Sequence, residues 1–167
     1  MRKMSEHGPK RTPLAFHFRD VVLLPGSVLV IIPLMIHQYT PHIIPGYWSV
    51  KLLSILVFVC GSGLFCWTNY LFNTIAGGTL APWTSKEKLL KQGPYKYNRN
   101  PMLTGVLFML IGECLWFRSA PILIWCGVFF LICSALLILI EEPFLRKKFG
   151  EDYHHYKKEV PRWIPNL

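Results

Sequence analysis

Four long apolar stretches are the feature that most limits how this 167-residue chain can fold. They cover residues 21–36, 49–72, 102–117 and 121–140. A helix needs about 20 apolar residues to cross a bilayer, within a range of roughly 17–25. The second and fourth stretches meet this requirement, the first does so if it extends a few residues each way, and the third is short. We therefore predict an all-α, polytopic membrane helical bundle with four transmembrane helices.

The composition agrees with a membrane protein rather than a soluble domain. Hydrophobic residues make up 52% of the chain and charged residues only 16%, whereas an average soluble domain carries about 25% charged residues. The mean hydropathy is +0.34. Because the length is that of one domain, we predict that residues 1–167 form a single domain.

The Lys and Arg residues lie in three segments that the predicted topology brings to one side of the membrane. Sixteen of the 18 precede the first stretch, separate the second from the third, or follow the fourth, and only Lys51 and Arg118 lie near the other two turns. The positive-inside rule then predicts that both termini are cytoplasmic. The simple topology and the absence of organelle signals indicate a prokaryotic inner membrane. Acidic residues interleave with these basic ones, so we interpret the net charge of +9 as attraction to membrane lipids and predict no nucleic-acid binding.

Two segments outside the apolar stretches are too long or too amphipathic to be simple connectors. Residues 73–100 form a polar stretch in which we predict a flexible loop over 73–80, a short interfacial helix over 86–90 and a turn at Gly93-Pro94. Residues 144–156 mix aromatic, apolar and charged side chains, which predicts an amphipathic helix on the cytoplasmic membrane surface, broken near Gly150. We expect the loop and this C-terminal segment to cover a cofactor from the cytoplasm.

The sequence predicts no metal site. All five cysteines lie inside apolar stretches without a Cys-x-x-Cys pair, and the histidines have no metal-ligand spacing. Packing is the default role for the cysteines. His154 and His155 are interpreted as interfacial residues that remain open as proton carriers, and Glu113 as a snorkelling or locally ion-paired residue.

Two polar motifs remain as candidates for chemistry. Glu141 and Glu142 end a strongly apolar helix, where the helix dipole is also negative, so they are either solvated beside neighbouring cations or face a cationic or polyhydroxy ligand. The segment of residues 92–102 contains Arg99, whose guanidinium fits a carboxylate, and a proline start to the third helix. Both motifs fall on the same membrane side. They predict one pocket for a zwitterionic ligand that carries a carboxylate and an ammonium or sulfonium.

At these residues the sequence resembles the integral membrane methyltransferases, which include isoprenylcysteine carboxyl methyltransferases and phosphatidylethanolamine N-methyltransferases. The resemblance covers GPYKYNRNPMLTG and the later IEEPFLRKKFGEDYHHYKKEVPRWIP, between about residues 89 and 165, the cofactor-binding half of the domain. Asn100 stands where the isoprenylcysteine enzymes usually have a histidine, and a tyrosine that commonly follows the proline is replaced by Met102-Leu103. Asn-Pro-Met and Glu-Glu-Pro-Phe look closer to the phospholipid branch.

The resemblance implies S-adenosyl-L-methionine as cofactor and a lipid-like methyl acceptor, either a carboxylate or an amine of an isoprenylated or phospholipid-type substrate. It implies catalytic roles for Glu142 and Arg99. The cofactor-binding residues carried over by position are Gly61, Gly63, Gly93, Pro94, Tyr95, Arg99, Asn100, Pro101, Glu141 and Glu142.

Two other functions stay open at this point. One is an NADPH-dependent membrane reductase of related helical architecture, which we would expect to be longer and richer in basic residues for the 2′-phosphate. The other is a non-enzymatic membrane scaffold in which the polar motifs only cap helices. The sequence leaves the acceptor and the oligomeric state undetermined.

Overall fold

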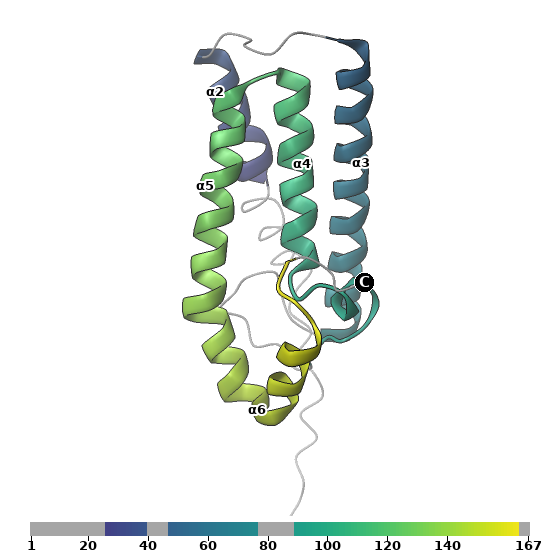
Figure 1. The fold of residues 1–167 in the computed structure, drawn as a ribbon, viewed down its shortest axis with the longest axis vertical. Helices are drawn as coiled ribbons and strands as arrows, with labels where there is room; N and C mark the ends of the chain where they lie inside the picture. The colour runs from purple at the N-terminus through teal and green to yellow at the C-terminus, as the bar shows by residue number, and fades with distance from the viewer. Residues whose placement is uncertain (1–25, 40–46, 77–88, 164–167) are drawn as a thin grey trace, which may run out of the picture.

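The computed structural model describes residues 26–39, 47–76 and 89–163, and within these ranges all regular structure is helical, without a β-strand. The main helices are α2 (Ile32–Tyr39), α3 (Trp48–Leu71), α4 (Pro101–Phe117), α5 (Ala120–Leu136) and α6 (Glu142–Glu159). The short helical turns are η1 (Ser27–Ile31), η2 (Phe72–Ala76), η3 (Gly93–Lys96) and η4 (Leu137–Glu141). Figure 1 shows α3, α4 and α5 side by side, α2 beside one end of α5, and α6 at the other end.

Two helices are long and apolar enough to cross a membrane, judged by length and composition over the described ranges. They are α3 and the helix that runs from Ala120 through η4 into α6. The η1–α2 helix and α4 are apolar but shorter. At about 1.5 Å per residue, the 17 residues of α4 span roughly 26 Å, less than the ~30 Å hydrocarbon core. The all-helical fold is confirmed, and the count of four transmembrane helices stays a prediction.

Glycines allow the backbones of α3 and α4 to touch. A Cβ atom at Gly61 would lie 2.7 Å from the Gly105 carbonyl oxygen, and one at Gly105 would lie 2.9 Å from the Gly61 carbonyl oxygen. A Cβ at Gly112 would meet the Phe58 Cβ at 2.9 Å. Small residues at helix crossings permit this approach, and van der Waals contact between backbones then stabilises the pair. This contact fixes α3 against the helix that begins at the polar motif.

The turn between α4 and α5 is tight. Arg118 adopts the left-handed conformation with φ 54°, and Ser119 precedes the first residue of α5. The Ser119 amide donates to the Cys114 carbonyl oxygen at 3.3 Å, which closes the end of α4. Near the start of α5 the Trp125 indole donates to the Val28 carbonyl at 3.3 Å. In the π-helical turn η1 a carbonyl accepts from the amide five residues later. For Val28 that residue is Pro33, which has no N–H, so the carbonyl is left for the indole.

Several predicted boundaries differ from the structure. The helix of α3 continues through η2 to Ala76, so the first part of the predicted loop over 73–80 is helical. Leu89 and Leu90 are not helical, and the rest of the segment predicted as a short helix, residues 86–88, lies outside the described residues. The turn at Gly93 is confirmed by its φ of 58°. The predicted break in α6 is also confirmed, because Gly150 has φ 52° and ψ −123°.

Candidate functional site

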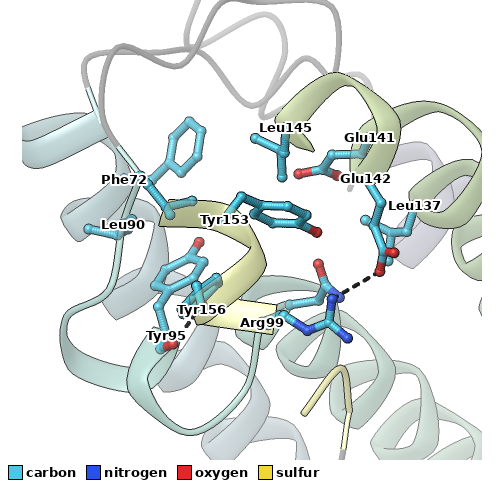
Figure 2. Close-up of a pocket in the computed structure, with 12 residues that line it drawn as sticks. Phe72, Leu90, Tyr95, Arg99, Leu137, Glu141, Glu142, Leu145, Tyr153 and Tyr156 are labelled. Carbon is cyan, nitrogen blue, oxygen red and sulfur yellow. Dashed lines mark hydrogen bonds and ion pairs between the residues drawn. The ribbon is translucent and has the colours of Figure 1, made fainter. Parts of the chain in front are cut away.

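A pocket lies between η2 at the end of α3, the turn that precedes α4, η4 and α6. The space enclosed by its lining amounts to about 520 Å³, including solvent at the mouth. Figure 2 shows the carboxylates of Glu141 and Glu142 on one side, Tyr95 and Tyr156 on the other, and the ring of Tyr153 between them. The lining residues are Phe72, Leu89, Leu90, Tyr95, Arg99, Asn100, Leu137, Glu141, Glu142, Leu145, Tyr153 and Tyr156.

One carboxylate, that of Glu142, binds three cations. Its Oε1 accepts hydrogen bonds from Arg99 Nη1 at 3.0 Å and from Arg162 Nε and Nη2 at 3.0 and 2.7 Å. Its Oε2 accepts from Lys157 Nζ at 2.9 Å. The side chains of Arg99 and Glu142 are only 10% and 13% exposed, whereas Lys157 is 41% exposed. The arrangement leaves an excess of positive charge around a single anion in a partly desolvated site.

The surroundings of Glu142 favour its ionised form. Burial by itself raises the pKa of a carboxyl, but hydrogen bonds from Lys157 and Arg162 and the charges of Arg162 and Arg99 outweigh it, so the pKa of Glu142 lies below its ordinary value of 4.5. A carboxylate held in this way is a weak proton acceptor. Its hydrogen bond from Arg99 holds that guanidinium in place.

Hydrogen bonds along the turn before α4 fix the position of Arg99. The Asn98 side chain accepts from the Asn100 amide at 2.7 Å and donates to Thr104 Oγ1 at 2.8 Å and to the Trp163 carbonyl at 3.0 Å. The Arg99 amide donates to the Pro161 carbonyl at 3.1 Å. Asn98 is 6% exposed, so these bonds satisfy polar groups that water cannot reach. The C-terminal segment is thereby tied to the first turn of α4.

Tyrosines form the opposite wall and remain protonated. The Tyr156 hydroxyl donates to the Tyr95 carbonyl oxygen at 2.7 Å. Burial, and after it the negative charge of Glu141, raises the pKa of the Tyr95 hydroxyl. Burial also raises the pKa of Tyr153, aided by the charges of Glu142 and Glu141 and opposed by Arg99. Neutral aromatic rings beside carboxylates are the kind of wall that attracts an organic cation.

The structure brings together five of the residues predicted to bind a cofactor and separates the other five from them. Tyr95, Arg99, Asn100, Glu141 and Glu142 line the pocket. Gly93, Pro94 and Pro101 line a second cavity on the other side of the same segment.

Gly61 and Gly63 line neither cavity. Gly61 is packed against α4, and nothing lies within 4 Å of a Cβ added at Gly63. The geometry shows that Gly61 allows α3 and α4 to pack closely. The cofactor-binding role for both glycines stays a prediction.

Sequence reasoning missed the residues that complete the site from α6 and beyond it. Tyr153 and Tyr156 are three positions apart, so they share one helix face, and both are buried at 4% exposure. That spacing within an otherwise charged helix was a usable signal. Lys157 and Arg162 carried no comparable signal, because a cation that follows a membrane helix is equally consistent with topology alone.

The remaining titratable candidates lie outside this pocket. His154 and His155 are not part of its lining. Over residues 26–39, 47–76 and 89–163 no three His, Cys, Asp or Glu side chains are grouped so as to hold a metal ion. Glu141 lines the pocket beside Glu142.

Comparisons with known proteins give the family. The sequence model described as phospholipid methyltransferase matches residues 50–152, more than half of the chain, from the first turn of α3 through α4 and α5 into α6. A protein of Haemophilus influenzae described as uncharacterized is 37% identical over 65 residues, which are 38% of this chain and the whole of that protein.

Proposed function

Because the chain belongs to the phospholipid methyltransferase family, we propose that it transfers a methyl group from S-adenosyl-L-methionine to a lipid-like acceptor of the phospholipid type. The family itself points to a methyltransferase at a membrane. The observation that carries the finer proposal is the pocket in which Arg99 and Glu142 meet beside Glu141 and three tyrosines. In this proposal the protein spans the membrane with four helices, and this pocket and both termini face the cytoplasm, in keeping with the positive charge of the connecting segments.

The chemistry of the pocket lining supports this cofactor. The Nε of Arg99 is buried, and among the residues that the structure describes it has no hydrogen-bond partner. A buried guanidinium N–H of this kind fits a carboxylate, while Glu141 and the tyrosine rings fit a sulfonium. Tyr95, Arg99, Asn100, Glu141 and Glu142 would hold the group.

When bound, the cofactor supplies an electrophilic methyl group on sulfur. The chain's own residues align the two reactants and keep water out, which are the main demands of an in-line displacement. The buried rings of Tyr95, Tyr153 and Tyr156 exclude water from this wall of the pocket. Glu142 orients Arg99, and through Arg162 and Lys157 it holds the C-terminal segment over the site.

An amine acceptor must also release a proton. Glu142 is unsuited to accept it, because three cations stabilise its ionised form. His154 and His155 do not line the pocket. In this proposal the Glu141 carboxylate would accept the proton that an amine acceptor gives up when it is methylated. A carboxylate acceptor would need no such base.

The proposal is tested with purified protein in nanodiscs, a total lipid extract and methyl-radiolabelled S-adenosyl-L-methionine. The expected result is a labelled lipid whose headgroup is identified by mass spectrometry, and loss of labelling in Arg99→Gln. Calorimetric titration with the cofactor gives a second measurement that needs no acceptor. Wild-type protein that neither binds the cofactor nor labels any lipid would contradict the proposal.

A further inference from the structure

A second cavity lies on the other side of the segment that precedes α4. It is open to the outside and encloses about 950 Å³, including solvent. Leu64 and Trp67 of α3 form one wall. The other wall comes from residues of the turn and the first residue of α4, namely Gly93, Pro94, Lys96, Tyr97, Asn98 and Pro101. We call this cavity the α3 groove.

The segment of residues 93–101 divides the two cavities. Tyr95, Arg99 and Asn100 line the pocket described above, and the other six residues of the segment line the α3 groove. Gly93 holds the segment directly against α3, since a Cβ there would lie 2.7 Å from Leu71 Cδ1. One short motif therefore lines two cavities. This explains why Gly93, Pro94 and Pro101 do not join the cofactor pocket.

The lining of the α3 groove is apolar with one cation. Leu64, Trp67 and Pro101 present hydrocarbon and aromatic surface, and Lys96 is the charged side chain among the residues that line it. The α3 wall belongs to a helix long and apolar enough to span a membrane. An apolar surface on such a helix faces acyl chains, and a lysine beside it attracts an anionic headgroup.

Exposed aromatic side chains place the α3 groove at the level of the lipid headgroups. Trp67 is 56% exposed and Tyr97 is 54% exposed. Tyr70, one turn further along α3, is 67% exposed. Tryptophan and tyrosine concentrate at membrane–water interfaces, where the ring is buried and the polar end meets water. The groove therefore combines a headgroup-level position, an apolar wall and a phosphate-attracting cation.

We propose that the α3 groove binds a phospholipid, with the lipid phosphate at Lys96 and an acyl chain along Leu64 and Trp67. The role of this lipid as the methyl acceptor rests on the proposed function, but its binding does not. The headgroup would lie next to residues 95–100, and the cofactor pocket lies immediately behind them.

Trp67 allows the binding to be measured without a methyl donor. The delipidated full-length protein in maltoside micelles is titrated with phosphatidylglycerol or with diacylglycerol, both carrying the same brominated acyl chains. The fluorescence of Trp67 is obtained by subtracting the signal of Trp67→Phe. We expect saturable quenching by phosphatidylglycerol. Lys96→Gln should weaken the apparent affinity about fivefold, in keeping with roughly 1 kcal/mol for one lysine near a lipid phosphate.

Lys147→Gln is the matched control, since Lys147 is also an exposed lysine and lines neither cavity. The proposal is overturned by equal quenching with diacylglycerol, by quenching that rises linearly without saturation, or by an equal effect of the two lysine variants. If quenching of Trp67 decreases as the protein concentration rises, a second copy of the chain covers the groove, and the proposal is overturned too. Lipid labelling without specific Trp67 quenching would reject the groove while the methyltransferase proposal stands.

Discussion

Arg99 Nη1 donates to Glu142 Oε1 across 3.0 Å, although the two residues are 43 positions apart. The bond joins the turn that precedes α4 to the helix that continues α5. Arg162, 20 positions beyond Glu142, binds the same oxygen at 2.7 Å. One carboxylate thus connects three parts of the chain at the edge of the pocket.

Replacing Glu142 with glutamine should destabilise the protein by about 2–4 kcal/mol, because it leaves partly buried guanidinium groups without their anion. Breaking a fully buried ion pair costs about 3–5 kcal/mol. We do not expect the top of that range, because Lys157 on the same carboxylate is 41% exposed. The measurement is thermal unfolding in detergent, with Glu151→Gln at an exposed position as control. Cofactor titration of the same variant should show no binding. Unchanged melting and titration would show that the Glu142 cluster is not needed.

Stability should depend on pH below the ordinary pKa of 4.5 for a glutamic acid. The pKa of Glu142 is lowered in the folded protein, so its contribution is complete above that value and is lost as the pH falls through the folded pKa. Melting temperatures measured from pH 7 down to about pH 3 should fall more steeply in the wild type than in Glu142→Gln. Parallel curves would mean that other carboxyl groups govern acid unfolding.

Gly61→Ala and Gly63→Ala should differ sharply although they are two positions apart. A Cβ at Gly61 lies 2.7 Å from the Gly105 carbonyl oxygen and must push α3 from α4, whereas nothing lies within 4 Å of one at Gly63. We expect Gly61→Ala to cost about 1–3 kcal/mol and Gly63→Ala to be neutral or slightly stabilising. Differential scanning calorimetry in the same detergent measures both. Equal melting temperatures would contradict the packing role of Gly61.

Tyr156→Phe removes the hydroxyl that donates to the Tyr95 carbonyl at 2.7 Å. The buried carbonyl then loses its partner, which should cost about 1–3 kcal/mol. Tyr97→Phe is the control, because Tyr97 is 54% exposed. Hydrogen exchange of the η3 and α6 amides should also speed up in Tyr156→Phe alone. An equal loss of stability in both variants would indicate a general effect of removing a hydroxyl.

The sequence predicted the helices better than their ends. Apolar stretches identify α3, α4 and α5 because each must bury or shield its backbone polar groups within itself. The continuation of α3 to Ala76 was missed because Asn73 and Thr74 favour loops when read locally, while packing of the buried Phe72 against Leu90 and Tyr95 extends the helix. Local preference yields to tertiary contact at such positions.

For the site, the sequence by itself determined which groups of the chain are charged, where Gly93 and Pro101 allow a turn and a helix start, and that Arg99 and Glu142 would fall on one side of the bundle. Which cations surround Glu142, and which residues of 93–101 line each cavity, were decided only by the tertiary structure. The reason is physical: periodicity and charge act along a helix over a few residues, whereas a cluster drawn from Arg99, Lys157 and Arg162 forms only after packing has brought distant segments within about 3 Å of one carboxylate.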